Sequence, residues 1–163
     1  MITLGQVPDG LQEIKECYGD PDPDGDFVID RWWFENYMQS YKLPYSMRLS
    51  WKPDVVVRTM LAHKFVGPAM IDAFREILTM VGLEVLQKNE WDRFGGCFNP
   101  RPKTGSSEHS VHFWGIAVDV NPHLAPYGQR DHKQPKVIVD AFERRGMVWL
   151  PFDGMHTQAC TGY

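Results

Sequence analysis

Apolar positions follow a helical spacing in three stretches of the chain. In "GPAMIDAFREILTMVG", residues 67–82, apolar side chains repeat every three or four positions until Gly82, which predicts a helix. The preceding stretch, "KPDVVVRTMLAHKFVG" at 52–67, has the same spacing behind a capping Asp54 and predicts a second helix. A third helix is predicted in "QPKVIVDAFERRG", residues 134–146, where proline and glycine mark the two ends.

Beyond residue 82 the pattern changes to short runs that are typical of strands. "LEVLQ", "GGCFN", "GIAVDVN" and "MVWLP" are rich in β-branched or aromatic residues and are separated by glycine, proline and polar clusters. Residues 1–45 carry "DPDPDGD" and "RWWFENY", which predict an irregular N-terminal cap segment whose tryptophans pack onto the domain. Helices followed by a small sheet indicate an α+β fold.

The composition fits one domain that spans residues 1–163. With 43% hydrophobic and 13% aromatic residues, the chain can form one substantial core. A net charge of -4 gives no electrostatic reason to expect a nucleic-acid partner. No apolar run reaches the length of roughly 18 residues that a transmembrane helix needs, so we expect no membrane insertion. We expect a monomer.

The first residues and the cysteines bear on the compartment. "MITLGQVPDGLQEIKECYGD" lacks the basic segment and apolar core of a secretory signal peptide, so we expect synthesis inside a cell without such a signal. Cys17, Cys97 and Cys160 are widely spaced and form no CxxC pair. We therefore expect buried or free thiols, and neither a disulfide framework nor a cysteine zinc site.

An acidic stretch near the N-terminus partly matches a calcium-binding loop. Asp20, Asp22 and Asp24 fall at positions 1, 3 and 5 of such a loop, with Gly25 at position 6. Position 12, which needs a bidentate glutamate, is Arg31. We therefore favour a solvated acidic turn.

A carboxylate stands inside an apolar run in "HSVHFWGIAVDVNP", residues 109–122. Asp119 follows His112 by seven residues, and a buried charge is costly unless a cation or several donors meet it. In a strand, Gly115, Ala117 and Asp119 share one face, which points away from the apolar layer and toward the side that His112 can reach. Small residues on that face allow a backbone or a ligand to approach closely.

A second histidine and carboxylate occur near the C-terminus. In "FDGMHTQ", Asp153 precedes His156 by three residues. His156 would complete a His, Asp, His ligand set with an open fourth position, as in catalytic zinc sites. The spacing alone also fits a hydrogen-bonded histidine–aspartate pair, and it does not decide between the two.

A family resemblance favours the metal. "SVHFWGIAVDVNP" resembles the S-x-H-x-x-G-x-A-x-D signature of the M15 family, which comprises zinc D-Ala-D-Ala carboxypeptidases of the VanY type and L-alanyl-D-glutamate endopeptidases, including phage endolysins. The signature positions are Ser110, His112, Gly115, Ala117 and Asp119. "DGMH", "GGCFNPR" and the opening "VPDGLQEIKECYGDP" also resemble family segments. The fold that this resemblance implies is the Hedgehog/DD-peptidase type, a small antiparallel sheet with helices packed on one side.

The resemblance also implies roles for single residues. Zn²⁺ is bound by His112, Asp119 and His156, and Asp153 acts as general base. Arg101 stabilises the oxyanion.

Three further residues receive smaller roles. Ser110 binds substrate or orients His112, or else it caps a loop. Arg93 is the alternative to Arg101 as the cation that faces the substrate. His109 fails the signature and is expected to be a loop residue or an outer hydrogen-bond partner.

The function implied is zinc-dependent hydrolysis of peptidoglycan stem peptides, as an L-Ala-D-Glu endopeptidase of the endolysin kind. Two alternatives stay open: a D-Ala-D-Ala carboxypeptidase, and a non-catalytic zinc-binding module of the Hedgehog type. The substrate lies in the cell wall, so we expect release by phage lysis, association with a virion, or secretion by another route.

Overall fold

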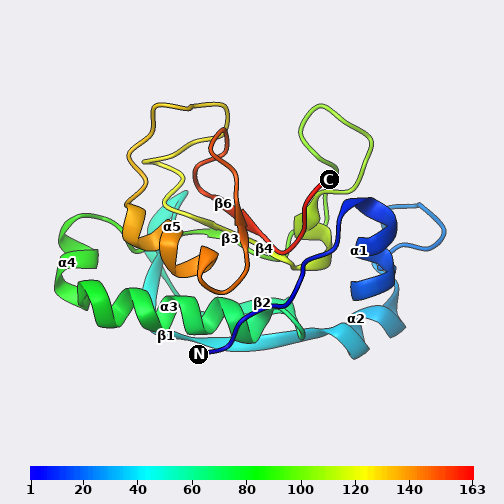
Figure 1. Ribbon diagram of the computed structural model, residues 1–163, viewed down its shortest axis with the longest axis horizontal. Coiled ribbons are helices and arrows are strands. Elements are labelled where there is room, and N and C mark those ends of the chain that lie inside the picture. The colour runs from blue at the N-terminus through cyan, green and yellow to red at the C-terminus, as the bar shows by residue number, and fades with distance from the viewer.

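The computed structural model describes residues 1–163 as a mixed structure of helices and strands (Figure 1). The helices are α1 (Gly10–Tyr18), α2 (Arg31–Tyr37), α3 (Gly67–Val81), α4 (Leu83–Lys88) and α5 (Lys136–Glu143), with a short 3₁₀ helix, η1 (Val111–Trp114). The strands are β1 (Met38–Leu49), β2 (Lys52–His63), β3 (Arg93–Gly96), β4 (Ala117–Val120), β5 (Val148–Trp149) and β6 (His156–Gln158). This content agrees with the predicted α+β class.

The strands form one sheet in the order β2-β1-β3-β4-β6-β5. Neighbouring strands are antiparallel except β1 and β3, which run parallel. The sheet is therefore mixed, and the expectation of a purely antiparallel sheet is wrong. The reason is that α3 and α4 lie between β2 and β3 in the chain, so β3 returns to the sheet through a helical crossover and not through a hairpin.

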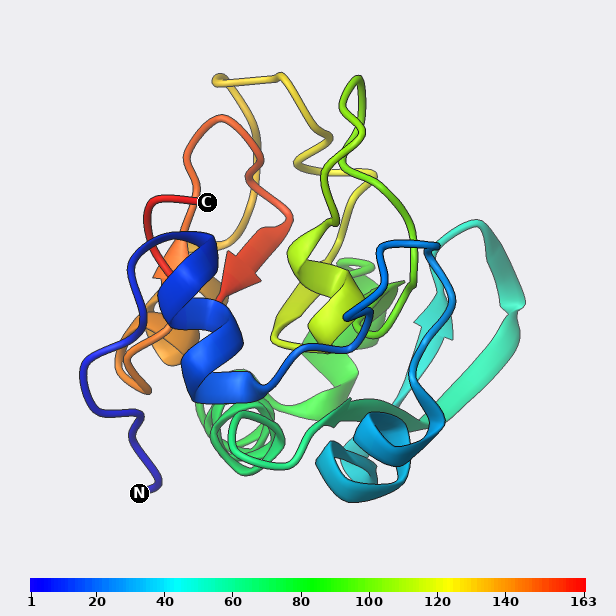
Figure 2. The ribbon, with the colours of Figure 1, turned by 90° about the vertical axis from the view of Figure 1, so that its right-hand side faces the viewer.

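Two of the predicted helices are confirmed, and they pack together. Phe74 of α3 and Phe142 of α5 meet edge to face with ring centroids 5.2 Å apart, and Met70 and Ile77 of α3 are fully buried. Figures 1 and 2 show α3 and α5 on one side of the sheet and the loops that contain residues 97–110, 121–135 and 150–155 on the other. The loop side is where the polar candidates gather.

The helix predicted over residues 52–67 is wrong, because this segment forms β2. A spacing of four residues, such as Val56 to Met60, fits the period of a strand as well as that of a helix. Three consecutive valines favour the strand, since their β-branched side chains restrict the helical rotamer. Met60 and Ala62 are buried at alternate positions, as a strand requires.

"LEVLQ" is helical in the structure, as α4, and the strand predicted there is wrong. Gly82, at φ 82°, separates α4 from α3. Only Leu86 of this helix is buried, and Glu84, Gln87 and Lys88 are good helix formers. The strands predicted in "GIAVDVN" and "MVWLP" are confirmed in shorter form by β4 and β5. The strand predicted in "GGCFN" is shifted, because β3 shares only Gly95 and Gly96 with it.

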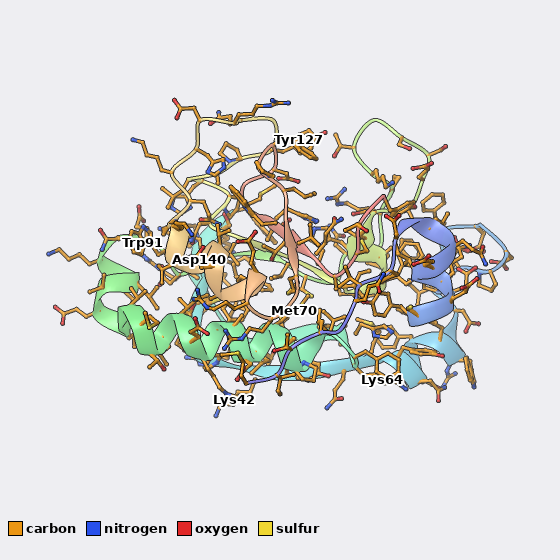
Figure 3. The ribbon with its side chains drawn as sticks, viewed as in Figure 1. Lys42, Lys64, Met70, Trp91, Tyr127 and Asp140 are labelled. Carbon is orange, nitrogen blue, oxygen red and sulfur yellow. The ribbon has the colours of Figure 1, made fainter.

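The N-terminal segment is more regular than expected, because residues 1–45 contain α1, α2 and the first part of β1. Trp33 packs into the core at 1% exposure, as predicted, whereas Trp32 on the same helix is 65% exposed. No helix of the structure has the length and apolar character needed to cross a membrane. Figure 3 shows Tyr127 on the loop side of the molecule and Lys42 and Lys64 on the opposite side.

Candidate metal centre

His112, Asp119 and His156 come from three different elements and converge on the loop side of the sheet. His112 lies in η1, Asp119 in β4 and His156 in β6. Asp119 and His156 are directly opposed partners in the antiparallel register of β4 and β6, which fixes their side chains next to each other. All three residues are at most 9% exposed.

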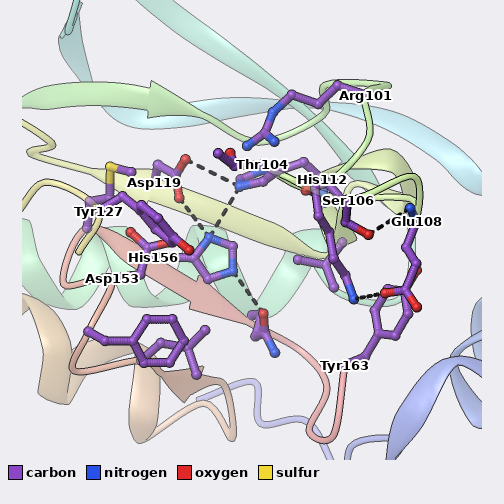
Figure 4. A pocket seen from close by; sticks show the side chains of 17 residues that line it. Arg101, Thr104, Ser106, Glu108, His112, Asp119, Tyr127, Asp153, His156 and Tyr163 are labelled. Carbon is purple, nitrogen blue, oxygen red and sulfur yellow. Dashed lines mark hydrogen bonds and ion pairs between the residues drawn. The ribbon is translucent and has the colours of Figure 1, made fainter.

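The donor atoms of these residues lie within hydrogen-bonding range of one another (Figure 4). His112 Nε2 is 3.2 Å from His156 Nδ1, which is 2.9 Å from Asp119 Oδ1. Asp119 Oδ2 is 3.3 Å from His112 Nε2. Around a tetrahedral ion with bonds of about 2.0–2.1 Å, neighbouring donors are roughly 3.3 Å apart. The three side chains therefore fit as a possible metal site.

The outer hydrogen bonds of both histidines fix where their protons lie. His112 Nδ1 donates to the Cys97 carbonyl at 2.6 Å, because a carbonyl oxygen can only accept. His156 Nε2 donates to Gln158 Oε1 at 2.9 Å, and the amide nitrogen of Gln158 in turn donates to the Cys160 carbonyl. With one nitrogen of each ring bonded in this way, the other nitrogen of each ring faces Asp119, and such an outer shell is typical of metal-bound histidine.

The electrostatics of the centre favour positive charge. Burial acts to raise the pKa of Asp119, yet the adjacent His112 and His156 rings, which donate to this carboxylate when they are protonated, outweigh burial and hold the pKa well below its usual range. Burial acts to lower the pKa of His156, but the bond and charge of Asp119 outweigh it and raise that pKa. A bound cation would supply the positive charge that this carboxylate attracts.

A glycine in β3 lets the strands approach closely at Asp119. A Cβ atom at Gly95 would lie 2.7 Å from the Asp119 Cβ, a distance that forces the neighbour to move. The following Gly96 has φ +126°, a conformation that disfavours other residues, and it pairs with Asp119 in the register of β3 and β4. The "GG" of the predicted strand thus serves the placement of the carboxylate.

The donor set opens into a pocket of about 310 Å³. One wall is apolar, with Leu150, Phe152 and Met155 beside Tyr127. The opposite wall carries Arg101, Lys103, Thr104, Ser106 and Glu108 of the loop before η1. The pocket therefore combines a buried metal-binding end, an apolar wall and a polar, charged wall, which is a usual composition for a ligand site.

Asp153 lines this pocket together with the three donors, and Figure 4 shows it beside His156. Its Oδ1 is buried and has no hydrogen-bond partner in the protein. Burial and the negative charge of Asp119 raise the pKa of Asp153 against the opposing charge of His156. A carboxylate with a raised pKa and an unpaired oxygen in a pocket is able to exchange protons with a ligand.

The structure brings Arg101 and Ser110 to the pocket but not Arg93. The Arg101 guanidinium points toward His112 and Asp119 in Figure 4 and forms no ion pair. Ser110 is buried, lines the pocket and accepts the backbone N–H of His112 at the start of η1. Arg93 lies outside the pocket, because its guanidinium bonds to Glu90.

The acidic stretch and the remaining histidines lie outside the pocket. Asp22 accepts hydrogen bonds from His109 Nε2 at 2.6 Å and from three backbone N–H groups. The stretch is therefore a turn, as predicted, but the Asp22 carboxylate is buried in it, whereas the prediction was a solvated turn. His63 is fully buried against Tyr18 and Trp33, and His132 packs on Trp149. The three cysteines are free, as expected.

Two partners of the centre are absent from the sequence prediction. Gln158 lies two residues after His156 on the same strand, so its side chain shares a face with that histidine, and this spacing was the available signal. The Cys97 carbonyl is a backbone group and leaves no signal in a sequence.

Comparison with known proteins gives one match. Residues 104–159, about a third of the chain, match a family model of M15 peptidases described as D-alanyl-D-alanine carboxypeptidase. No curated protein and no solved structure matches the chain. The matched range contains His112, Asp119, Asp153 and His156, so over these residues, which include the whole candidate centre, the chain is similar to the M15 peptidase family.

Proposed function

We propose that this protein is a zinc peptidase that cleaves peptidoglycan stem peptides, most specifically the bond between L-Ala and D-Glu. The observation that carries the proposal is the convergence, in one pocket, of three buried metal donors with Asp153, whose Oδ1 is buried and has no hydrogen-bond partner. The match to an M15 family model supports the choice of a peptidase and of a wall peptide as substrate.

His112, Asp119 and His156 would hold the zinc ion, two through nitrogen and one through oxygen, which is a ligand set that zinc accepts. When bound, zinc lowers the pKa of water toward about 7 and polarises the scissile carbonyl. Cys97 and Gln158 orient both histidines through their outer hydrogen bonds.

Asp153 carries the proton. Its unpaired oxygen takes a proton from the attacking water as the water oxygen bonds to the carbonyl carbon. The same group then gives that proton to the leaving nitrogen as the C–N bond breaks, so a carboxylic acid and a free amine result. Arg101, which has no carboxylate partner in the protein, faces the negative charge that develops on the carbonyl oxygen.

A D-Ala-D-Ala carboxypeptidase is the second candidate, and one observation favours it. The Arg101 guanidinium, which donates to the Pro102 carbonyl but has no carboxylate partner, would also suit the terminal carboxylate of such a substrate. The size of the pocket, about 310 Å³, favours the endopeptidase, because a single terminal alanine would leave most of that space unfilled. A binding module of the Hedgehog type has no need for a buried base, so Asp153 argues against it.

Digestion of purified peptidoglycan, followed by mass analysis of the fragments, tests the proposal. We expect new N-terminal D-Glu on the released peptides and muramyl-L-Ala left on the glycan. Release of free D-Ala alone would establish the carboxypeptidase instead. If a folded, zinc-loaded sample leaves every stem peptide intact, the peptidase proposal is wrong.

The substrate places the site of action at the cell wall. Release through phage lysis, delivery on a virion and secretion by another route would each bring the protein there. Fractionation of a producing culture, with activity measured before and after lysis, distinguishes release by lysis from continuous secretion.

A further inference from the structure

The donor set lies between two cavities, and the second has no role so far. It has a volume of about 280 Å³, close to the 310 Å³ of the pocket described above. His112, Asp119 and Arg101 line both cavities. An extended substrate bound across the donor set would therefore have one part in each cavity.

We propose that the second cavity, here called the Trp51 cavity, binds the acyl side of the substrate, with the Trp51 indole as the platform for a saccharide ring. This inference rests on the proposed function, because it assigns the two ends of a stem peptide to the two cavities. Besides the three shared residues, the Trp51 cavity is lined by Trp51, Gly95, Gly96, Phe98 and Asn99.

The position of Asp153 sets the direction in which the substrate lies. Asp153 lines the first pocket but not the Trp51 cavity. The group that protonates the leaving nitrogen must be within reach of it, so the amine side of the scissile bond lies in the first pocket. The acyl side then extends past His112 and Asp119 into the Trp51 cavity.

The chemistry of the two cavities agrees with this direction. The first pocket contains Arg101, Lys103 and Glu108, which suit the charged amino acids that follow the L-Ala-D-Glu bond. In the Trp51 cavity the only charged side chain besides the metal candidates is that of Arg101. With L-Ala at the donor set, the next group on the acyl side is a neutral N-acetylated sugar, which has an apolar face for an indole and an acetamido group for the Asn99 amide.

Trp51 is held where a platform is needed. It lies in the two-residue connection between β1 and β2, and the backbone N–H of the preceding Ser50 donates to the Phe94 carbonyl of β3 at 2.9 Å. This bond fixes the tip of the hairpin beside the strand that neighbours Asp119. The Trp51 side chain is nevertheless 71% exposed, so its indole is open to a ligand.

Binding of the acyl-side product fragment tests the proposal without catalysis. In the Asp153→Asn background, N-acetylmuramyl-L-alanine is titrated by calorimetry, and circular dichroism checks that each variant is folded. We expect Trp51→Ala to weaken binding roughly 3- to 10-fold, the range for one lost aromatic stacking contact. Trp32→Ala is the matched control, because Trp32 is 65% exposed and lines neither cavity.

The proposal would be overturned if Trp51→Ala and the parent protein bound the fragment with equal affinity. It would also be overturned if Trp32→Ala weakened binding as much as Trp51→Ala, or if the parent protein did not bind the fragment. A second measurement uses the active protein and compares kcat/KM for a sugar-linked stem peptide with that for the free peptide. We expect Trp51→Ala to lower the ratio of the two values, and an unchanged ratio contradicts the platform. Failure of the proposed function shows separately, as absence of any cleavage by the parent protein.

Discussion

Two buried aspartates in this protein each meet histidine, and they differ in what completes their surroundings. Asp22 receives four hydrogen bonds, one from His109 at 2.6 Å and three from backbone N–H groups of Gly25, Asp26 and Phe27 at 2.9–3.0 Å. The Asp119 carboxylate receives no backbone hydrogen bond, and its oxygens contact His156 Nδ1 at 2.9 Å and His112 Nε2 at 3.3 Å. The protein therefore supplies hydrogen-bond donors to the Asp22 carboxylate, whereas it supplies no backbone donor to the Asp119 carboxylate.

The direction of the histidine protons explains the difference. His109 Nε2 donates to the Asp22 carboxylate, because a carboxylate can only accept. His112 and His156 donate away from Asp119, to the Cys97 carbonyl and to Gln158. A histidine–aspartate contact alone therefore does not identify a metal centre. The distinguishing feature is that the histidine protons are bound elsewhere, so that lone pairs converge.

Removal of a donor gives the largest effect that separates the two sites. His112→Ala, Asp119→Ala and His156→Ala should each weaken zinc binding by more than the ~100-fold that loss of an outer partner costs, because three ligands are the minimum for a tight site. His109→Ala is the matched control and should retain the parent affinity. Competition with a chromogenic chelator measures the affinities, and full occupancy in all three donor variants would exclude the assigned site.

Asp153→Asn separates metal binding from catalysis at the Asp119 site. The variant should keep its zinc and its fold, since Asp153 is not one of the three donors. Hydrolysis of a stem peptide should fall by roughly 10²-fold or more, as expected when a general base is lost. Activity within a few-fold of the parent protein would show that the base is a different residue, with Glu108 the first to test.

Asp22→Ala tests the opposite property, namely that Asp22 serves the fold. The substitution leaves backbone donors of the turn without their acceptor and should lower the free energy of unfolding by about 2–3 kcal/mol. Urea unfolding measures this change, and zinc affinity should stay at the parent value. A loss of zinc without a loss of stability would reverse the roles of the two aspartates.

The effect of Asp22 on stability should depend on pH. Burial acts to raise the pKa of Asp22, but its bonds from His109 and the backbone outweigh burial and lower the pKa below the ordinary 3.8. Because the folded state favours the ionised form, the stabilisation is fully present above the ordinary pKa and is lost as the pH falls through the lower, folded-state value. The stability difference between parent and Asp22→Ala should therefore shrink in acid. An increase in acid would contradict this sign.

Gln158→Ala gives the smallest of these effects and tests the outer hydrogen bond itself. Without the acceptor of His156 Nε2, zinc affinity should fall roughly 10- to 100-fold. Ser110→Ala is the comparison, because Ser110 contacts the backbone of His112 and not its ring. That variant should fall less than Gln158→Ala, and an equal or larger loss would show that the outer bond has no special effect.

The local sequence determined the candidate centre better than it determined the fold around it. Asp119 could be recognised because a carboxylate in the apolar run "GIAVDV" needs a partner. His112 and His156 were candidates from their positions in the sequence, and the family resemblance favoured a metal over a hydrogen-bonded pair. Gln158 was not predicted, because a glutamine in a strand indicates no particular role unless its neighbour is known to need a hydrogen-bond acceptor. Arg93 does not line the pocket, and the local sequence does not show that its guanidinium bonds to Glu90.

Elements were wrongly predicted where the spacing of apolar residues fits both a helix and a strand, or where the segment is short. In residues 52–63, the spacing of Val56 and Met60 fits both a helix and a strand. The segment forms a strand because it pairs with β1, and the local sequence does not reveal this pairing. Helix α4 has one buried residue, Leu86, and so carries almost no periodic signal. The parallel pairing of β1 with β3 depends on contacts between distant segments, whereas α3 and α5 were predicted because long apolar faces encode them locally.

Anomalous scattering at the zinc absorption edge, from crystals of the parent protein grown with zinc, locates the proposed metal site. It shows where the metal lies and compares the two aspartates in one experiment. We predict one strong anomalous peak, at a zinc ion that lies about 2.0–2.2 Å from His112 Nε2, His156 Nδ1 and an Asp119 carboxylate oxygen, and no peak at Asp22. The absence of a peak between these three residues, or a peak at Asp22 in its place, would show that His112, Asp119 and His156 are not the zinc site.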